Sequence, residues 1–301
     1  MRNHLQSIGA AVVSLVVSGA CCCAGGTGGP YIPSPRSDML AGWQDFPADQ
    51  VPRPIVLKGL FIDRPADFSG EGSVAIGCHK FTLSTGTSQP APRQATATWT
   101  DGVSVIYPAS SARDIFAAMN PTPPSNTGDC AGVAPVVVTA APLGTDTFQT
   151  DRGPAQMTAW VFRLAVVGPP KFWSYPAVAA SSIWRGAKAV RYSTDVAIAS
   201  GDGLFLTITF YGFPEGSGQC ESTWIGAAAE SMSAVEVDPQ PTRSPQGSGC
   251  PLTLVQRWVT VPLKSPLGGR VVLNTTGGVF TVCPSIPKPE SPPCYFLPLR
   301  G

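Results

Sequence analysis

The residues with the clearest chemical capacity are nine cysteines, three of which stand together at positions 21–23. The other six are an even number spread along the chain, as expected for disulfide pairing in an exported protein. Pairing between sequence neighbours fits separate modules best, so we expect three disulfides. The pairs are Cys78 with Cys130, Cys220 with Cys250, and Cys283 with Cys294.

The spacing of the cysteines argues against metal binding and thiol catalysis. A zinc site needs closely spaced ligands such as C-x-x-C or H-x-x-x-H, and no such pair occurs beyond Cys21 to Cys23. Cysteines paired in disulfides supply no thiolate, which is the nucleophilic form. The sequence also lacks a Gly-rich phosphate loop, a calcium loop and a haem motif, so we expect neither a metal nor a cofactor.

Hydrolytic chemistry would have to use His79 or a pair of carboxylates. His79 stands at the end of an apolar strand, and no Gly-x-Ser-x-Gly turn positions a nucleophile, which favours an ordinary structural histidine. A glycosidase needs two acids about 5 to 10 Å apart, and sequence spacing does not reveal such a pair. Each available acid is more typical of a solvated turn, so we expect no enzyme, with a carboxylate hydrolase as an alternative. These acids are Asp151, Glu215, Glu221 and Glu230.

Two features suggest binding without catalysis. Asp151 and Arg152 form a charged pair in the turn TDRGP between two expected strands, and loops on a β scaffold often carry binding residues. The alternative is an ordinary hairpin end in which Asp151 bonds its own backbone and Gly153 takes a positive φ. The seven tryptophans would form a carbohydrate-stacking surface if some were exposed, although core packing is their default. They include Trp160, Trp173, Trp184, Trp224 and Trp258.

The N-terminus has the outline of a signal peptide. An uncharged apolar run, Ile8–Ala20, follows Arg2 and is shorter than the about 20 residues that a membrane-spanning helix needs. Its end, VSGAC, resembles the lipobox of bacterial lipoproteins, which implies lipidation of Cys21, although Ser18 stands where the family pattern has Leu or Val. Lipidation would anchor the chain to the outer face of the membrane. The alternative is a freely secreted protein cut after Ala20.

The remainder reads as a mostly β protein. Alternating or β-branched runs recur between turn signals, which is typical of strands. Over 157–164 and 204–211 the alternation sends apolar side chains to one face, as in a half-buried antiparallel sheet. We expect antiparallel sheets in two β-sandwich-like modules with one or two short helices. The expected strands are PIVLKGL, SVAIG, QATATWT, VSVIY, APVVVTAA, MTAWVFRLAVV, GLFLTITFYG, LTLVQRWVTVPL, GRVVLN and GVFTV.

Two segments are candidates for the helices. Ser111–Met119 begins with a capping-box-like pattern, in which Asp114 follows Ser111 by three residues, and Pro121 ends it. Ser222–Met232 is rich in alanine, which has the highest helix propensity. We expect the first segment to be helical and treat the second as a weaker candidate.

An internal echo suggests how the chain is divided. PLGTDTFQTDRG (142–153) and PLGGRVVLNTTG (266–277) both predict a turn at PLG, a short strand, and a second turn whose glycine takes a positive φ. We interpret them as parts of two related β modules, although chance repetition of a common turn is the alternative. The expected divisions are 1–20 signal peptide, 21–53 Gly/Pro-rich tether, 54–172 first module and 173–301 second module.

The leader, the cysteine cluster, the tether, the low charge and TDRGPAQMTAWVFRL together resemble uncharacterised exported lipoproteins of high-GC actinobacteria. This resemblance implies a location at the cell surface and no particular activity. Charged residues are 13% of the chain, the net charge is +1, and the lysines and arginines are scattered, which argues against nucleic acid as a partner.

We therefore expect a lipid-anchored surface protein whose partners are the membrane and either cell-wall glycan or a surface protein. Such a protein should present an exposed aromatic or apolar patch. A spacer protein without a specific ligand would show no such patch, and it remains the alternative from another functional class.

Overall fold

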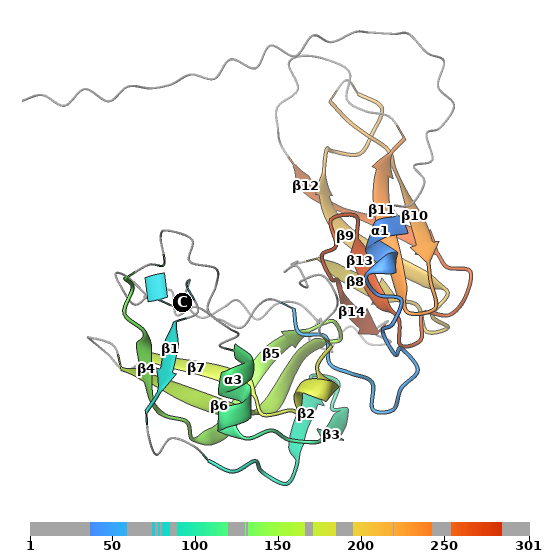
Figure 1. Ribbon diagram of the computed structural model, residues 1–301. Coiled ribbons are helices and arrows are strands. Elements are labelled where there is room, and N and C mark those ends of the chain that lie inside the picture. Colours follow the sequence, from blue (N-terminus) through green and yellow to red (C-terminus); the bar gives the residue numbers. More distant parts are fainter. Residues whose placement is uncertain are drawn as a thin grey trace, which may run out of the picture. The chain divides into compact units, whose positions relative to one another are not determined.

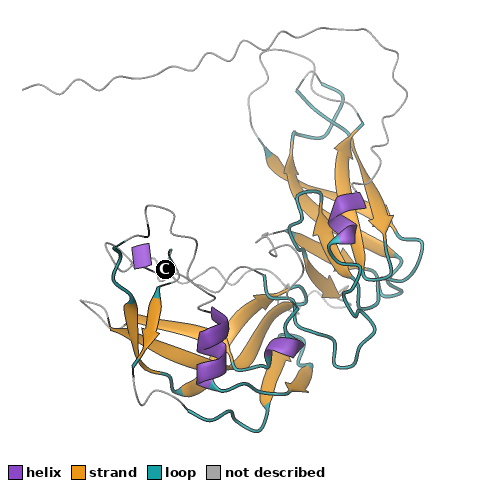
Figure 2. Ribbon diagram, in the orientation of Figure 1, coloured by secondary structure: helices purple, strands orange, loops and turns teal. Residues whose placement is uncertain are grey.

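The computed structural model of the protein describes residues 37–58, 74, 75, 78, 80–84, 89–119, 130, 132–165, 171–184, 195–218, 220–242 and 254–284. Fourteen strands within these residues form three sheets, and helices are few (Figure 2). The prediction of a mostly β chain is therefore confirmed. The signal peptide, Cys21 and His79 lie outside the described residues.

Seven strands form the sheet that we call the first sheet (Figure 1). Its central strand is β6, which pairs with β5 and then β4 along one edge, and with β2 and then β7 along the other. β3 extends the sheet beyond β2, and β1 pairs in parallel with β4. The strands are β1 (Phe81–Leu83), β2 (Ala95–Trp99), β3 (Ser104–Tyr107), β4 (Val136–Ala140), β5 (Leu143–Thr150), β6 (Gly153–Ala165) and β7 (Lys171–Pro176).

The burial pattern of β6 changes along its length. Ala155, Met157 and Ala159 are buried in its first half, but from Trp160 onward the even-numbered residues are buried instead. The predicted alternation over 157–164 is thus present, but it shifts by one residue at the middle of the strand. Each half of this long strand consequently turns a different face toward the same core.

A two-turn helix packs against the first sheet. Helix α3 (Ala112–Met119) begins as predicted: the Ser111 hydroxyl accepts a hydrogen bond from the Asp114 amide at 3.1 Å and donates one to its carboxylate at 2.6 Å. Ile115 is buried, and the ring of Phe116 lies 6.4 Å from that of Phe162 on β6. The cap therefore fixes where the helix starts, and aromatic packing holds it on the sheet.

The remaining seven strands form a two-layer sandwich, which we call the sandwich. One layer has the order β10-β11-β13 and the other β12-β9-β8-β14. Leu206 and Ile208 of one layer share a core with Val235, Val237 and others of the opposite layer. The strands are β8 (Val196–Ala199), β9 (Phe205–Gly212), β10 (Trp224–Glu230), β11 (Ala234–Pro241), β12 (Val255–Pro262), β13 (Val271–Asn274) and β14 (Thr281–Pro284).

The predicted helix over Ser222–Met232 is wrong, because this segment contains β10. Every residue of β10 pairs with β11 in an antiparallel ladder. Gly226 also brings the strand close to β12, since an added Cβ would lie 2.4 Å from a Val261 methyl group. Sheet pairing and close packing therefore override the helix propensity of the alanine run.

The predicted strand at SVAIG is also wrong where the structure describes it. Val74 and Ala75 are helical, and the Cys78 amide donates a hydrogen bond to the Val74 carbonyl at 2.8 Å. Ala75 is buried in the core of the first sheet, whereas Val74 is exposed. A short apolar run flanked by glycines did not distinguish a strand from a helical turn here.

The predicted tether, 21–53, is corrected for residues 37–53, which together with residues 54–58 form a segment that we call the strap. The strap begins with helix α1 (Ser37–Ala41). Beyond this helix, the rings of Trp43 and Phe46 are buried against β11 and β13 of the sandwich. Further on, Ile55 and Leu57 form isolated bridges with residues 183 and 150, beside the first sheet. The prediction rested on the Gly- and Pro-rich composition of the segment and gave no weight to its few large apolar residues. Burial of those residues holds this part of the chain on the fold.

The boundary predicted after residue 172 cuts through a strand. β7 spans that position and pairs with β6 throughout, so the first sheet continues past it, and the sandwich strands begin at Val196. The strap and both groups of strands belong to one unit, Ile32–Gly301. The division of the β region therefore falls after residue 184 of the described chain, and the strap joins both parts.

The two echo segments share their second turn. Gly153 and Gly277 both have positive φ, 98° and 82°, where the chain reverses after a strand. Their first parts differ, because Leu143 and Gly144 already lie in β5, whereas Gly268 sits in a turn with φ 54°. One segment also belongs to a seven-stranded sheet and the other to a sandwich. The strand arrangements give duplication no support.

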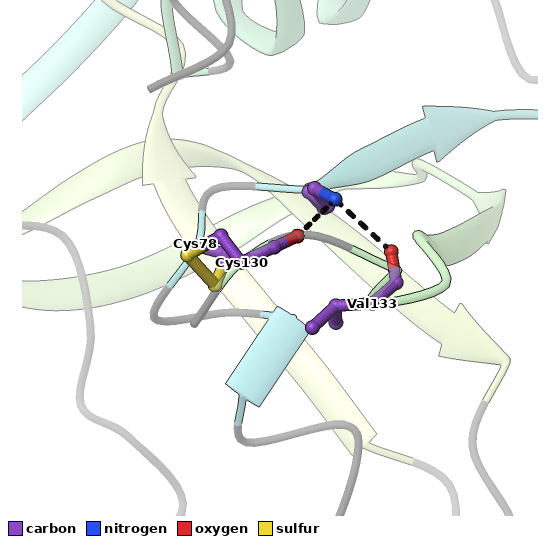
Figure 3. The surroundings of a disulfide bond; sticks show 4 residues. Cys78, Cys130 and Val133 are labelled. Carbon is purple, nitrogen blue, oxygen red and sulfur yellow. Dashed lines mark hydrogen bonds between the residues drawn. A yellow bond between two sulfur atoms is a disulfide. The ribbon is translucent and has the colours of Figure 1, made fainter. Parts of the chain in front are cut away.

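A disulfide joins Cys78 and Cys130, as predicted (Figure 3). It closes a loop of 52 residues and brings the carbonyl of Cys130 beside Lys80. The ammonium group of Lys80 donates hydrogen bonds to this carbonyl and to that of Val133, the latter at 3.3 Å. The disulfide and these hydrogen bonds together hold the segments that precede β1 and β4 against each other.

Two further predicted disulfide cysteines are described. Cys220 and Cys283 are both disulfide-bonded. Cys250 and Cys294, their predicted partners, lie outside the described residues. All four described members of the set of six are therefore oxidised, and the two remaining pairings stay predictions.

We predict that Phe46→Ala lowers the free energy of unfolding by about 3 to 5 kcal/mol, because it removes a buried ring and leaves a cavity against the sandwich. Phe46 is 3% exposed, whereas Val51 of the same strap is 94% exposed. Val51→Ala should therefore change this free energy by less than about 0.5 kcal/mol. Urea denaturation with the disulfides intact measures both, and equally small effects would restore the tether interpretation.

Candidate functional site

The predicted binding pair, Asp151 and Arg152, occupies the hairpin turn between β5 and β6, where Asp151 is buried and Arg152 is half-buried. Asp151 pairs with Arg53 of the strap, with 2.5 Å between carboxylate oxygen and guanidinium nitrogen. The Arg152 guanidinium lies over the Trp99 ring, 3.9 Å from its centre. Both charges therefore contact other parts of the chain, and a binding role for this turn stays a prediction.

Backbone hydrogen bonds fasten this turn on two sides. The Asp151 amide donates to the Val56 carbonyl of the strap at 3.1 Å, and the Asp151 carbonyl accepts from the Val282 amide of β14 at 2.7 Å. The Arg53 side chain continues the network by donating to the Gly269 carbonyl at 2.6 Å. Hairpin, strap and sandwich thus meet at one residue, Asp151.

A buried lysine lies in the same region. Lys58 of the strap donates a hydrogen bond from Nζ to the Thr281 hydroxyl at 2.5 Å. Burial lowers the pKa of Lys58 from 10.5 to about 8, and the nearby carboxylates of Asp195 and Asp151 oppose that shift. The Asp195 carboxylate accepts a hydrogen bond from the Asn274 amide at 3.0 Å. The charged groups of this cluster contact one another or neighbouring polar groups, which indicates a structural role, although Asp151 Oδ1 and Arg53 Nη1 are buried without a hydrogen-bond partner among the described residues.

This lysine predicts a pH dependence of stability. The unfolded chain keeps the lysine proton up to a pKa of 10.5, whereas the folded chain releases it at about 8. Between these values the unfolded state binds more protons, so the free energy of unfolding should rise with pH, by on the order of 3 kcal/mol at about 1.4 kcal/mol per pH unit. Urea denaturation at several pH values from 7 upward, with the disulfides intact, measures this rise.

Two variants separate Lys58 from the other lysines. Lys58→Met should remove the rise, because the group that titrates differently in the two states is gone. Lys264→Met, which changes an exposed lysine, should keep it. A rise that survives Lys58→Met would assign the pH dependence to another group.

The four acids of the hydrolase alternative each have a separate partner. Burial raises the pKa of Glu230, but hydrogen bonds from the Lys264 amide and from Arg270 outweigh this, so the pKa lies below its usual value. Glu221 accepts a hydrogen bond from the Gly218 amide at 2.7 Å. Glu215 is exposed and lies 3.8 Å from Arg257, and Asp151 pairs with Arg53. Glu215 and Glu221 lie in adjoining segments, because Glu215 forms an isolated bridge with Ser222 and a Cβ added at Gly216 would lie 2.0 Å from a Glu221 carboxylate oxygen. Their carboxylates still make separate contacts, one with Arg257 and the other with the Gly218 amide.

The tryptophans divide by exposure. Trp160 and Trp173 are buried in the core of the first sheet, while Trp184 and Trp224 are half-buried. Trp258 is 59% exposed on β12. Among the seven tryptophans, all of which are described, it is therefore the one that presents its ring to solvent.

Trp258 belongs to a larger exposed surface on the outer face of the sandwich. β12 and β9 lie side by side as an antiparallel pair (Figure 1). Their burial patterns show that alternate residues of both strands are turned away from the core. We call these outward residues the aromatic face. They are Phe205, Thr207, Thr209 and Tyr211 on β9, and Gln256, Trp258, Thr260 and Pro262 on β12.

The register of the two strands fixes the order of side chains on the aromatic face. Tyr211 is opposite Gln256 and Trp258 is opposite Thr209, so the two aromatic residues are diagonal neighbours, with Cα atoms about 7 to 8 Å apart. The next pair is Thr207 with Thr260, whose hydroxyl oxygens are 3.1 Å apart. Tyr211 is 69% exposed and Phe205, at the far end, is 46% exposed.

The alternation of residues in the sequence already indicated this face. The prediction missed it because it asked whether each tryptophan was exposed and did not ask on which side of its strand it lies. Within β12, Trp258 alternates in phase with Gln256 and Thr260, so these three residues lie on one face of the strand. The apolar Val259 and Val261 lie on the other face. A tryptophan in phase with polar residues on a half-buried strand is expected to point to solvent. The alternation predicted over 204–211, confirmed in β9, places Tyr211 on the solvent side in the same way.

Other classes of site find no support in the described chain. The described residues contain no group of three or more His, Cys, Asp or Glu side chains that could hold a metal ion. Within the same residues, no helix has the length and apolar character to cross a membrane. Comparisons with known protein families, with curated proteins and with solved structures found no significant match.

Proposed function

We propose that this is an exported, lipid-anchored protein of a bacterial cell surface that binds an envelope component through its aromatic face. The observation that carries the proposal is the exposure of Trp258 and Tyr211 side by side on an ordered strand pair. Scattered single apolar residues are normal on protein surfaces, but aromatic side chains gathered on one rigid face are typical of recognition sites.

Export is supported by the leader and by the cysteines. The Cys78–Cys130 bond and the oxidised state of Cys220 and Cys283 agree with an oxidising compartment. The lipobox-like end of the leader supports lipidation of Cys21, which would place the folded chain beside the membrane on its outer face. Residues 21–36 would then separate the anchor from the strap.

Binding accounts for the surface better than the two alternatives do. A spacer without a ligand has no use for an exposed Trp258 and Tyr211, whose apolar area favours association. A carboxylate hydrolase needs two acids that are free to act on a substrate, and each of the four candidate acids contacts an arginine or a backbone amide. A recognition surface without catalysis is therefore the function that the described residues support best.

The lipid anchor can be tested by phase partition. In a host that processes lipoproteins, the native protein should enter the detergent phase of a Triton X-114 extraction, and Cys21→Ala should move it to the aqueous phase. Cys23→Ala is the matched control and should stay with detergent. An aqueous native protein whose intact mass shows an unmodified chain starting at or near residue 21 would instead establish a freely secreted protein.

The binding role can be tested by retention on purified cell walls of a high-GC actinobacterium, the group that the leader and tether resemble. The protein lacking its lipid should be retained, and Trp258→Ala combined with Tyr211→Ala should reduce retention about tenfold or more, because both aromatic contact surfaces are lost. Ile106→Ala, at a residue of the first sheet that is 56% exposed, is the control and should leave retention unchanged. Equal retention of all three proteins would remove the aromatic face from the proposal.

A further inference from the structure

We infer that the ligand of the aromatic face is an extended, uncharged oligosaccharide that lies along β9 and β12. This inference rests on the proposed function and specifies the chemical class of the ligand. It follows from three properties of the face: its length, the position of its hydroxyl groups, and its lack of charge.

The face is long and narrow. From Phe205 to Tyr211 there are six residue steps along β9, which at about 3.4 Å each span about 20 Å. Its width is that of two strands, with axes about 5 Å apart. The half-buried Ile198 of β8 and the buried Cys283 of β14 follow beyond Thr207, so the exposed area does not widen in that direction. A strip of this shape matches an extended chain better than a globular partner.

Rings and polar side chains share the rows of the strip, which run Tyr211 with Gln256, Trp258 with Thr209, Thr207 with Thr260, and Phe205 with Pro262. Trp258 and Tyr211 lie toward one end and Phe205 lies at the other, while the hydroxyl pair of Thr207 and Thr260 lies between them. A protein–protein interface usually has an apolar centre with a polar rim, whereas polar side chains here lie beside and between the rings. A sugar chain suits the observed order, because its ring faces stack on aromatic side chains and its hydroxyls exchange hydrogen bonds with threonine.

The face carries no formal charge. Its eight outward residues are aromatic, hydroxyl, amide or proline side chains, and none of them is an Asp, Glu, Lys, Arg or His residue. Arg257 is the nearest cation along β12, but it lies on the opposite face of the strand, near Glu215. Binding an anionic polymer would remove its charges from water without supplying a cation in return, which costs free energy. An uncharged chain has a much smaller desolvation cost.

The experiment is competition for retention on the same cell walls. The competitors are neutral polysaccharide released from those walls, freed of anionic material on an anion-exchange column and sorted by chain length, and the anionic fraction itself. We expect long neutral chains to release the protein, neutral mono- and disaccharides to compete at least about tenfold less well, and salt to have little effect.

Two variants test the assigned contacts by direct titration with the long neutral chains. Thr260→Val removes one hydroxyl without changing the size of the side chain and should weaken binding several-fold, whereas Trp258→Ala should weaken it about tenfold or more. Ile106→Ala is again the control and should bind as the native protein does. Thermal unfolding of each variant, expected to match that of the native protein because all three positions are exposed, separates lost contacts from lost folding.

The outcomes distinguish this inference from the function it rests on. If retention needs Trp258 and Tyr211 but is blocked by the anionic fraction, or is abolished by protease treatment of the walls, the uncharged-glycan ligand is overturned and the binding role stands. If neutral disaccharides compete as well as long chains, the extended binding mode is overturned. If retention is independent of the aromatic face, both the inference and the proposed function fail.

Discussion

The burial of Trp43 and Phe46 against β11 and β13 is the interaction on which the arrangement of the chain depends. The three-stranded layer of the sandwich has apolar residues on both faces: Val235 and Val237 point to the opposite layer, while Ala234 and Leu273 point outward. A sheet with two apolar faces needs cover on both. The strap supplies the second cover, so a segment with the composition of a linker becomes part of the core.

The same strap explains why so much charge is buried in a chain with few charges. Having covered the sandwich, it passes the hairpin turn of the first sheet, where Arg53 meets Asp151 and Lys58 meets Thr281. Buried ion pairs contribute little net stability, because desolvation offsets the attraction between the charges. They do penalise alternative arrangements, since a shifted hairpin would leave Asp151 without its cation. The charge cluster therefore specifies how the parts join rather than how strongly they hold.

Local patterns predicted local structure well, and contacts between distant segments account for the errors. The cap at Ser111, the positive φ of Gly153 and the alternation of β9 follow from neighbouring residues, and all are confirmed. The role of Asp151 did not follow, because Arg53 lies 98 residues away in sequence. The alanine run in β10 failed for the same reason, since β11 and Val261 decide its conformation.

The two outer faces of the sandwich differ in how their apolar residues are covered, and this difference supports the proposed binding role. On one layer, the outward apolar residues of β11 and β13 are covered by Trp43 and Phe46 of the strap. On the other layer, Trp258 and Tyr211 are left in contact with water. Within the described residues, the strap therefore covers the outer face of one layer, and the outer face of the other layer stays exposed. Exposed aromatic area costs free energy in water, and that cost is recovered when a partner covers it. The uncovered face is consequently the part of the fold that packing within the described chain leaves incomplete and that a ligand would complete.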